Sequence, residues 1–267
     1  MRIERVVIIG AGPAGLAAAG QLKLYGIQPL VYECDEPGGL LLNACSVVNY
    51  PGVPEGISGS ELIRLFGLPA RLLFSEVTGI CRKEKLYLIH SGNGALCSRS
   101  VIIASGTVPL KIAIPGVAGD RIHYEVKKLA SSSGGSAAVI GGGDAALDYA
   151  MSLSCGYTVS VYARGDFSKV VPHLLEKVRK ISRVTLHPGS LPRDSFTEDI
   201  FIAAVGRTAR VDFISEKLLS SPPADGSFHM CGDCRNGIYR QTAIAVGNGV
   251  EAAIRTAGYL KKVETGK

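Results

Sequence analysis

The fold is decided by the residues Val6-Val-Ile-Ile-Gly-Ala-Gly-Pro-Ala-Gly15, which continue into Leu16-Ala-Ala-Ala-Gly-Gln-Leu-Lys-Leu24. Val6 to Ile9 form a β-branched run without a polar face, which is typical of a parallel strand buried on both sides. The glycine-rich turn opens a helix that Gly26 closes, and the apolar run Pro29-Leu-Val-Tyr32 follows. The stretch therefore predicts a unit of strand, helix and parallel strand.

Each glycine of this turn has a separate physical role. Gly10 permits the tight turn, Gly12 lets the backbone approach a pyrophosphate, and Gly15 allows close packing of the helix on the strand. Glu33 lies 23 residues after Gly10, at the end of the second strand. Its carboxylate can accept hydrogen bonds from both hydroxyls of a ribose. The unit therefore predicts a dinucleotide site with the phosphates on the helix N-terminus.

The same pattern returns in the second half of the chain. Ala137-Ala-Val-Ile140 predicts a buried strand, Gly141-Gly-Gly-Asp-Ala-Ala146 fills the glycine slots, and Thr158-Val-Ser-Val-Tyr162 predicts the next strand. Arg164 stands where the first unit has Glu33. A cation there suits a ribose 2′-phosphate better than a free hydroxyl. The alternative is that Arg164 is only a solvated residue at a strand end, without a role in binding.

Length and composition narrow the class of protein. The 267 residues suffice for about two domains, and 46% apolar with 19% charged residues excludes a disordered chain. The net charge of +6 is spread without blocks of like charge, which argues against nucleic-acid and membrane-surface partners. No apolar run reaches the 18 residues expected of a membrane-spanning helix.

The cysteines indicate a reducing compartment. They are Cys34, Cys45, Cys81, Cys97, Cys155, Cys231 and Cys234. Their number is odd and a chain of this length does not need disulfides, so we expect free thiols and a cytoplasmic location. His, Cys, Asp and Glu nowhere have the spacing of metal ligands, and no metal is predicted.

Two dinucleotide units in one chain predict an α/β protein with two Rossmann-like, three-layer domains, the second inserted into the first. The stretch Ser131-Ser-Ser-Gly-Gly-Ser136 and the pair Pro222-Pro223 have the composition of domain edges. We expect residues 1–108 and 223–267 to form the first domain, and residues 109–222 to form a shortened inserted domain.

These motifs resemble the low-molecular-weight thioredoxin reductases within the FAD- and NAD(P)-dependent pyridine nucleotide-disulfide oxidoreductases, over nearly the whole chain. Further matching stretches are Pro37-Gly-Gly-Leu-Leu, Asn49-Tyr-Pro-Gly52, Ile102-Ile-Ala-Ser-Gly-Thr107, Phe201-Ile-Ala-Ala-Val-Gly206, Cys231-Gly-Asp233 and Ile238-Tyr-Arg-Gln-Thr-Ala243. The resemblance implies a homodimer that binds FAD and NADPH. A helix opening at the last stretch would stabilise reduced flavin with its N-terminus.

The resemblance also implies which residues contact the two cofactors. The FAD contacts would be Gly10, Gly12, Pro13, Ala14, Gly15, Glu33, Gly39, Leu40, Asn49, Val77, Ala104, Ser105, Gly106, Gly232, Asp233, Arg240, Gln241, Thr242 and Ala243. The NADPH contacts would be Gly141, Gly143, Asp144, Ala145, Ala146, Arg164 and Lys169.

The chain departs from the family at the redox dithiol. Members carry a Cys-x-x-Cys shortly before the second glycine motif, whereas Ile122-His-Tyr-Glu-Val-Lys-Lys128 places Glu125 and Lys128 in those slots. Neither side chain can cycle between thiol and disulfide, and their spacing suits an ion pair on a helix. Between Arg183 and Phe201 we expect one strand and a connection, without the family's β-meander. We therefore expect the chain not to reduce thioredoxin.

Three cysteines remain as candidates for a catalytic thiol. Cys231 and Cys234 have the spacing of redox motifs, but they flank residues expected to hold FAD. Cys45 lies in the loop expected to flank the flavin, without a partner cysteine. The identity of the catalytic residues therefore stays open.

We expect an FAD-dependent oxidoreductase that relays electrons from NAD(P)H to a small-molecule or protein acceptor. Two alternatives stay open. In one, a ferredoxin-like protein or a partner subunit reduces the flavin and the NADPH domain is degenerate. In the other, the chain is a non-catalytic FAD-binding subunit of a larger complex.

Overall fold

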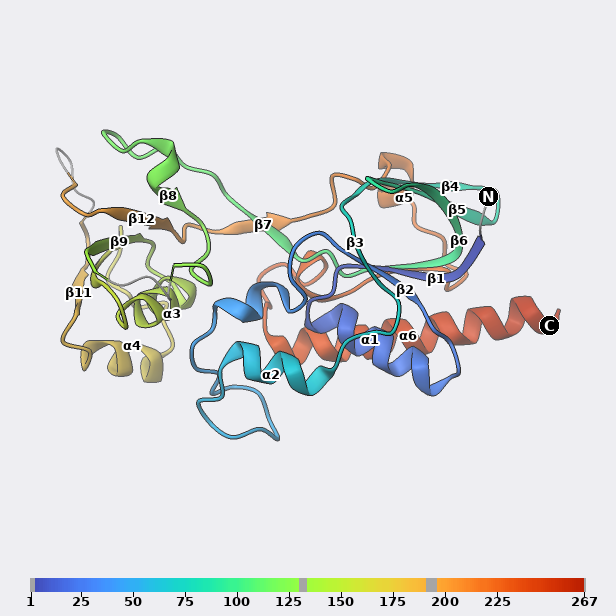
Figure 1. Cartoon of the computed structure of the whole chain (residues 1–267), viewed down its shortest axis with the longest axis horizontal. Coiled ribbons are helices and arrows are strands. Elements are labelled where there is room, and N and C mark those ends of the chain that lie inside the picture. The colour runs from blue at the N-terminus through green and yellow to red at the C-terminus, as the bar shows by residue number, and fades with distance from the viewer. Residues whose placement is uncertain (1–2, 130–133, 191–195, 267) are drawn as a thin grey trace. The chain divides into compact units, whose positions relative to one another are not determined.

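The computed structural model describes residues 3–129, 134–190 and 196–266 (Figure 1). The chain divides into two compact units: residues 1–41, 48–108 and 209–267 form the first, and residues 42–47 and 109–208 form the second. The second unit is thus an insertion in the first, and the predicted α/β class with two Rossmann-like sheets is confirmed.

The first unit is built on a mixed sheet in the order β3-β2-β1-β6-β5-β4, with β14 paired to β6. Its strands are β1 (Ile3–Ile9), β2 (Leu30–Glu33), β3 (Leu72–Phe74), β4 (Val77–Lys83), β5 (Leu86–Ser91), β6 (Gly94–Ile103) and β14 (Phe228–Met230). β3, β2, β1, β6 and β14 are parallel, whereas β6, β5 and β4 form an antiparallel meander. The long strand β6 belongs to both parts.

The parallel part of this sheet is covered on both faces, as the apolar run in β1 predicts. Val7 and Ile9 pack with Ile80 of β4 and Ile89 of β5 in one core cluster. Helices α1 (Pro13–Leu24) and α6 (Thr242–Thr265) pack against each other along the sheet (Figure 1). The remaining helical elements of this unit are η1 (Gly39–Asn43), whose end passes into the second unit, α2 (Gly59–Phe66), α5 (Glu216–Ser220) and η3 (Gly232–Cys234).

The second unit contains a parallel sheet in the order β11-β10-β9-β12-β8. Its elements are η2 (Gly119–Arg121), β8 (Ile122–His123), β9 (Ser136–Ile140), α3 (Asp144–Leu153), β10 (Thr158–Tyr162), α4 (Pro172–Arg179), β11 (Val184–His187) and β12 (Ile200–Ala203). Val139 and Val161 pack into the cluster that contains α3, whereas Ala138, Ile140 and Phe201 pack into another. Both faces of this sheet are therefore buried as well.

The inserted unit is reached through a two-stranded connection of β7 (Thr107–Pro109) and β13 (Arg207–Ala209). The chain returns to the first unit at Ala209, whereas we expected residue 223. Residues after Ala209 belong to the first unit because Phe213, Ile214 and Leu218 pack into its core and Ile80 N donates to Phe213 O at 2.8 Å. The predicted edge at 131–136 falls inside the second unit, and its residues 131–133 lie outside the described part of the chain.

We predict that Gly249→Ala destabilises the protein by about 2 kcal/mol, because overpacking displaces backbone. A Cβ on Gly249 of α6 would lie 2.1 Å from the carbonyl oxygen of Ala14 in α1. Gly247→Ala is the matched control, since a Cβ there meets nothing within 4 Å and alanine favours the helix by about 0.5–1 kcal/mol. Urea unfolding of both variants measures the difference, and equal stabilities would contradict the assigned α1–α6 contact.

Candidate functional site

The first glycine motif forms a tight crossing between β1 and α1. Gly10 has φ +103°, and a Cβ there would lie 2.3 Å from Ala104 O. A Cβ on Gly15 would lie 1.9 Å from Gly10 O, so neither position accepts a side chain. A Cβ on Gly12, by contrast, meets nothing within 4 Å. The first and third glycines therefore serve packing, and the second leaves room for a ligand to approach the backbone.

The N-terminus of α1 is suited to an anion. Gly12 is its N-cap, Pro13 occupies the first turn, and among the described residues no side chain caps this end and no acid lies in the first turn. The first N–H groups and the positive end of the helix dipole therefore face the loop. These are the features of a phosphate site.

Glu33 ends β2 beside this loop and is buried, with 8% of its surface exposed. Its Oε2 accepts the N–H of Ala11 at 2.7 Å, and its Oε1 accepts those of Cys34 and Asp35 at 2.8 and 3.0 Å. These bonds fix the carboxylate at the carboxyl end of the strand. Oε1 is filled by these bonds, whereas Oε2 retains acceptor capacity, which fits a ribose hydroxyl.

Other residues expected to contact FAD gather around the same helix end. Gly38 N donates to Ala11 O at 2.8 Å, and a Cβ on Gly39 would lie 3.5 Å from the Cα of Gly12. Gly232 of η3 also belongs here, because its Cβ would lie 2.8 Å from that of Ala14. The loop after β2, the first turn of α1 and η3 are thus neighbours.

A second group lies where α6 begins. Asn49 Nδ2 donates to Gln241 Oε1 at 2.7 Å, joining two of the expected FAD contacts that are far apart in the sequence. Gln241 is the N-cap of α6, so Thr242 and Ala243 lie in its first turn. Val77 differs from the rest, because its side chain is buried in the core of the first unit.

The second glycine motif repeats the first crossing. Gly141 has φ +154°, and a Cβ there would lie 2.4 Å from Ala204 O, just as Gly10 meets Ala104 O. Gly143 is the N-cap of α3 and has open space at its Cβ position. Ala146 fills the third slot and is fully buried. The geometry therefore fits a second phosphate at the N-terminus of α3.

Asp144 has a structural partner that the sequence did not indicate. It lies in the first turn of α3, and its Oδ1 accepts the N–H of Val171 at 2.8 Å. This bond ties the start of α3 to the loop after β10. Arg164 and Lys169 are both exposed on that loop. Their positions leave them accessible to a phosphate on the ribose of a coenzyme.

Glu125, which we expected in one slot of the family dithiol, forms a different ion pair from the one we expected. Glu125 pairs with Arg207 at 3.5 Å and not with Lys128, and residues 124–129 form a bend and turns without a helix. The expected Glu125–Lys128 helical pair is therefore wrong. The reason is a long-range contact, since Arg207 opens β13 far along the chain.

Sequence reasoning missed Asn43, which attaches the segment Leu42–Val47 to the second unit. Asn43 is 4% exposed, and its Oδ1 accepts the N–H groups of Val126 and Lys127, both at 3.0 Å. Ser152 Oγ of α3 donates to Asn43 O at 3.1 Å. A single polar residue ending the apolar stretch Gly39-Leu-Leu-Leu-Asn43 was the available signal.

Cys45 lies in this attached segment and is exposed. Burial of its thiol group nevertheless raises its pKa, while a hydrogen bond with the Ser152 side chain opposes the rise. Lys177 Nζ donates to the neighbouring Ser46 Oγ at 3.0 Å. A thiol with a raised pKa is a poor nucleophile at neutral pH, so these surroundings do not activate Cys45.

Cys231 and Cys234 are both buried, at 0% and 6% exposure. Both thiols donate to the carbonyl oxygen of Ile103, at 3.5 and 3.6 Å. Burial raises the pKa of each thiol. Thiols that are inaccessible and protonated cannot open a disulfide of another protein.

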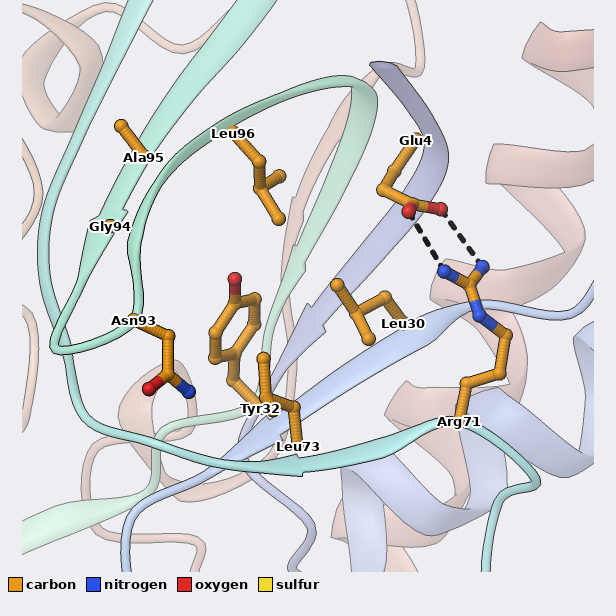
Figure 2. Close-up of a pocket in the computed structure, with 9 residues that line it drawn as sticks. All are labelled: Glu4, Leu30, Tyr32, Arg71, Leu73, Asn93, Gly94, Ala95 and Leu96. Atoms are coloured by element: carbon orange, nitrogen blue, oxygen red, sulfur yellow. Dashed lines mark hydrogen bonds and ion pairs between the residues drawn. The ribbon is translucent and has the colours of Figure 1, made fainter. Parts of the chain in front are cut away.

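A pocket of about 420 Å³ lies in the first unit between β2, β3 and the turn of the β5–β6 hairpin (Figure 2). At one side Arg71 forms a bidentate ion pair with Glu4, both bonds being 2.8 Å (Figure 2). Leu30, Leu73 and Tyr32 line the apolar part. The pocket contains none of the site residues expected from the sequence, and its charged groups already satisfy each other.

None of the described helices is both long enough and apolar enough to cross a membrane. Nor do three or more His, Cys, Asp and Glu side chains gather anywhere in the described ranges in a way that could hold a metal ion.

Asp148 of α3 gives the second unit a testable pH dependence. Burial raises its pKa from 3.8 to about 6, against the attraction of Lys177 and with a contribution from Asp144. Between about pH 4 and 6 the folded state therefore binds a proton more tightly than the unfolded state does. Protonation of Asp148 therefore stabilises the folded state at low pH, and this stabilisation is lost as pH rises through 6.

We predict that Asp148→Asn gains stability relative to the wild type as pH rises from 4.5 to 7.5, by about 2 kcal/mol. Urea unfolding at both pH values measures the change. Asp166→Asn is the control, because Asp166 is exposed and hydrogen bonds from Ser168 lower its pKa, so Asp166 stays ionised from pH 4.5 to 7.5 and its replacement should change stability almost equally at both pH values. Parallel pH curves for the wild type and Asp148→Asn would refute the prediction.

Comparison with known proteins agrees with this geometry. The thioredoxin reductase of Chlamydia trachomatis is 29% identical over 313 residues, which cover 98% of this chain and 100% of that protein. The Ferredoxin–NADP reductase of Ignicoccus hospitalis is 30% identical over 72% of this chain and 67% of its own length. The crystal structure of Lactococcus lactis thioredoxin reductase has a TM-score of 0.86 at 25% identity, with 97% and 99% of the two chains covered.

The family assignment rests on most of the chain. Residues 4–217 match the family model described as pyridine nucleotide-disulphide oxidoreductase, and this range contains both glycine motifs. Thioredoxin reductases of this family bind FAD and depend on NADPH, so the expected cofactors are confirmed at the level of the family. The chain belongs to the pyridine nucleotide-disulphide oxidoreductases and is an FAD-dependent oxidoreductase.

Proposed function

We propose that this chain uses NADPH to reduce its FAD and that the reduced flavin serves an acceptor other than thioredoxin, without a dithiol relay. The observation that carries the proposal is that Glu125 and Lys128 stand in the slots where the family has its redox cysteines, and that Glu125 is held in an ion pair with Arg207 of β13. The sequence holds no cysteine between Cys97 and Cys155, so no thiol of that region can take over the role. The acceptor must therefore reach the flavin itself.

The first unit supplies the residues that would hold FAD. The N-terminus of α1 binds the pyrophosphate, Glu33 binds a ribose, and Asp233 contacts the ribityl region. When bound, FAD supplies the exchange of two electrons. The N-terminus of α6, which begins after the N-cap residue Gln241, would stabilise negative charge on the reduced flavin through its dipole. The clustering of these residues around α1 and the start of α6 supports this assignment.

The second unit supplies the residues that would bind the coenzyme. The N-terminus of α3 binds the pyrophosphate, with Gly143 allowing close approach. Arg164 and Lys169 bind the 2′-phosphate from the loop that Asp144 ties to α3. Because the first unit carries a buried carboxylate at the equivalent strand end, the two sites favour different riboses.

A small electron-carrier protein is the acceptor class with the best support. The Ignicoccus relative is a Ferredoxin–NADP reductase, and it covers 72% of this chain. The direction of electron transfer stays a prediction. The presence of a partner subunit and the formation of a homodimer stay predictions as well. In the alternative, a small electron-carrier protein is the donor that reduces the flavin. The second unit would then be a degenerate NADPH domain that serves only as a scaffold.

The proposal is tested by anaerobic mixing of the FAD-loaded protein with NADPH and, separately, with NADH. We predict that NADPH bleaches the flavin absorbance and that NADH does so more slowly, because Arg164 favours a 2′-phosphate. Arg164→Ala should remove the preference without preventing FAD binding. Bleaching by dithionite alone would reject NADPH as the donor and favour the degenerate scaffold.

We also predict that the protein does not reduce thioredoxin at a measurable rate. Reduction of a protein disulfide needs an accessible thiolate and a resolving thiol, and Cys231 and Cys234 are buried with raised pKa values. A coupled assay with NADPH and several thioredoxins measures the rate. Turnover that disappears in a Cys231→Ser, Cys234→Ser double variant would identify Cys231-Gly-Asp-Cys234 as the active site instead.

A further inference from the structure

A line of four polar side chains runs along the carboxyl ends of β2 and β3 in the first unit. Glu33 ends β2, Cys34 follows it, Glu76 lies two residues after β3, and Arg210 follows β13. Arg210 Nη1 donates to Cys34 Sγ at 3.1 Å, and its Nη2 donates to Glu76 Oε1. Arg210 was not among the residues expected from the sequence to bind a cofactor.

The thiol of Cys34 connects this arginine to the ribose carboxylate. Burial raises the pKa of Cys34, although Arg210 opposes the rise, so the thiol stays protonated at neutral pH. It donates to Glu33 Oε1 at 3.6 Å while its sulfur accepts from Arg210. The guanidinium is thus held one residue away from Glu33.

The backbone of Arg210 is fixed independently of its side chain. Arg210 N donates to Gly106 O at 3.0 Å, and Ser105 Oγ donates to Arg210 O at 2.6 Å. Both partners follow β6, at the same carboxyl edge of the sheet. Removing the side chain therefore leaves the backbone bonds in place.

The order of strands says which part of a dinucleotide reaches this arginine. The parallel strands run β1, β2, β3 side by side, with the glycine loop after β1 and Glu33 at the end of β2. A dinucleotide that places its pyrophosphate on the loop and its ribose on Glu33 extends its base toward the end of β3. Glu76, and Arg210 bound to it, lie at that end.

The bonds of Arg210 leave the faces of the guanidinium available. Both terminal nitrogens donate to side chains, to Cys34 and to Glu76, and such bonds lie near the guanidinium plane. A planar guanidinium stacks well on an aromatic ring. The side chain is 27% exposed, so it is held in place yet open to a ligand.

We propose that Arg210 forms one wall of the adenine site of FAD, with its guanidinium stacked on the base and oriented by Cys34 and Glu76. This rests on the proposed assignment of FAD to the first unit. Arg210 is then a specificity-determining residue for the adenine base of the cofactor, which neither the glycine motif nor Glu33 recognises.

The experiment measures FAD dissociation constants of the refilled apoprotein by flavin fluorescence, for the wild type, Arg210→Ala, Arg210→Lys and Arg82→Ala. Arg82 is the matched control, since it is also 27% exposed and bonded to a carboxylate, Asp225 Oδ2, at 2.7 Å. Stacking predicts about tenfold weaker FAD binding in both Arg210 variants, because lysine keeps the charge but lacks the plane. Arg82→Ala should bind FAD as the wild type does.

A second measurement uses AMP as a probe of the adenosine site alone. AMP should compete with FAD on the wild type and about tenfold less well on Arg210→Ala. If Arg210→Lys binds FAD as tightly as the wild type does, the charge of residue 210 is sufficient and stacking is not needed, which would overturn the proposal. Unchanged FAD affinity in Arg210→Ala would also overturn it. If the wild type itself does not bind FAD, the proposed function fails as well, so the two failures are distinguishable.

Discussion

The architecture of the first unit depends on one close backbone contact, between Gly15 at the start of α1 and the carbonyl of Gly10. Because no side chain stands between them, α1 can begin directly over the end of β1, with its N-terminus at the carboxyl edge of the sheet. Gly232 and Gly249 then approach Ala14 in the same first turn. The loop, η3 and α6 are therefore assembled around a single helix turn.

Much of this arrangement is encoded locally. The apolar runs of β1 and β9 and the glycine motifs identify two parallel sheets and the helix ends that face their edges, because each signal lies within a few neighbouring residues. The return point at Ala209 is not local. It depends on Phe213 and Ile214 packing beside Ile80, and no pattern in residues 209–222 specifies which core they join.

In the candidate sites, too, some residues are predictable from local sequence and others depend on distant parts of the chain. Gly10, Gly12, Gly15 and Glu33 lie where the motif predicts, since the motif itself describes their geometry. The partners of Asp144 and Glu125 could not be read from the sequence, because Val171 and Arg207 come from other elements. The Glu125–Arg207 pair is partly exposed, and such pairs contribute about 0–1 kcal/mol to stability. The pair therefore adds little to the stability of the fold.

The first turns of α1 and α3 differ by one charge. The described first turn of α1 contains no acid, whereas that of α3 contains Asp144, whose carboxylate lies at the positive end of the helix dipole. Attraction of an anion by that dipole is worth about 0.3–1 kcal/mol at each helix end, and Asp144 cancels part of it. If the phosphates bind as proposed, the one on α1 would be held more tightly than the one on α3. Such a difference would suit the proposed roles of the two units, a cofactor that remains in the first unit and a coenzyme that is exchanged at the second.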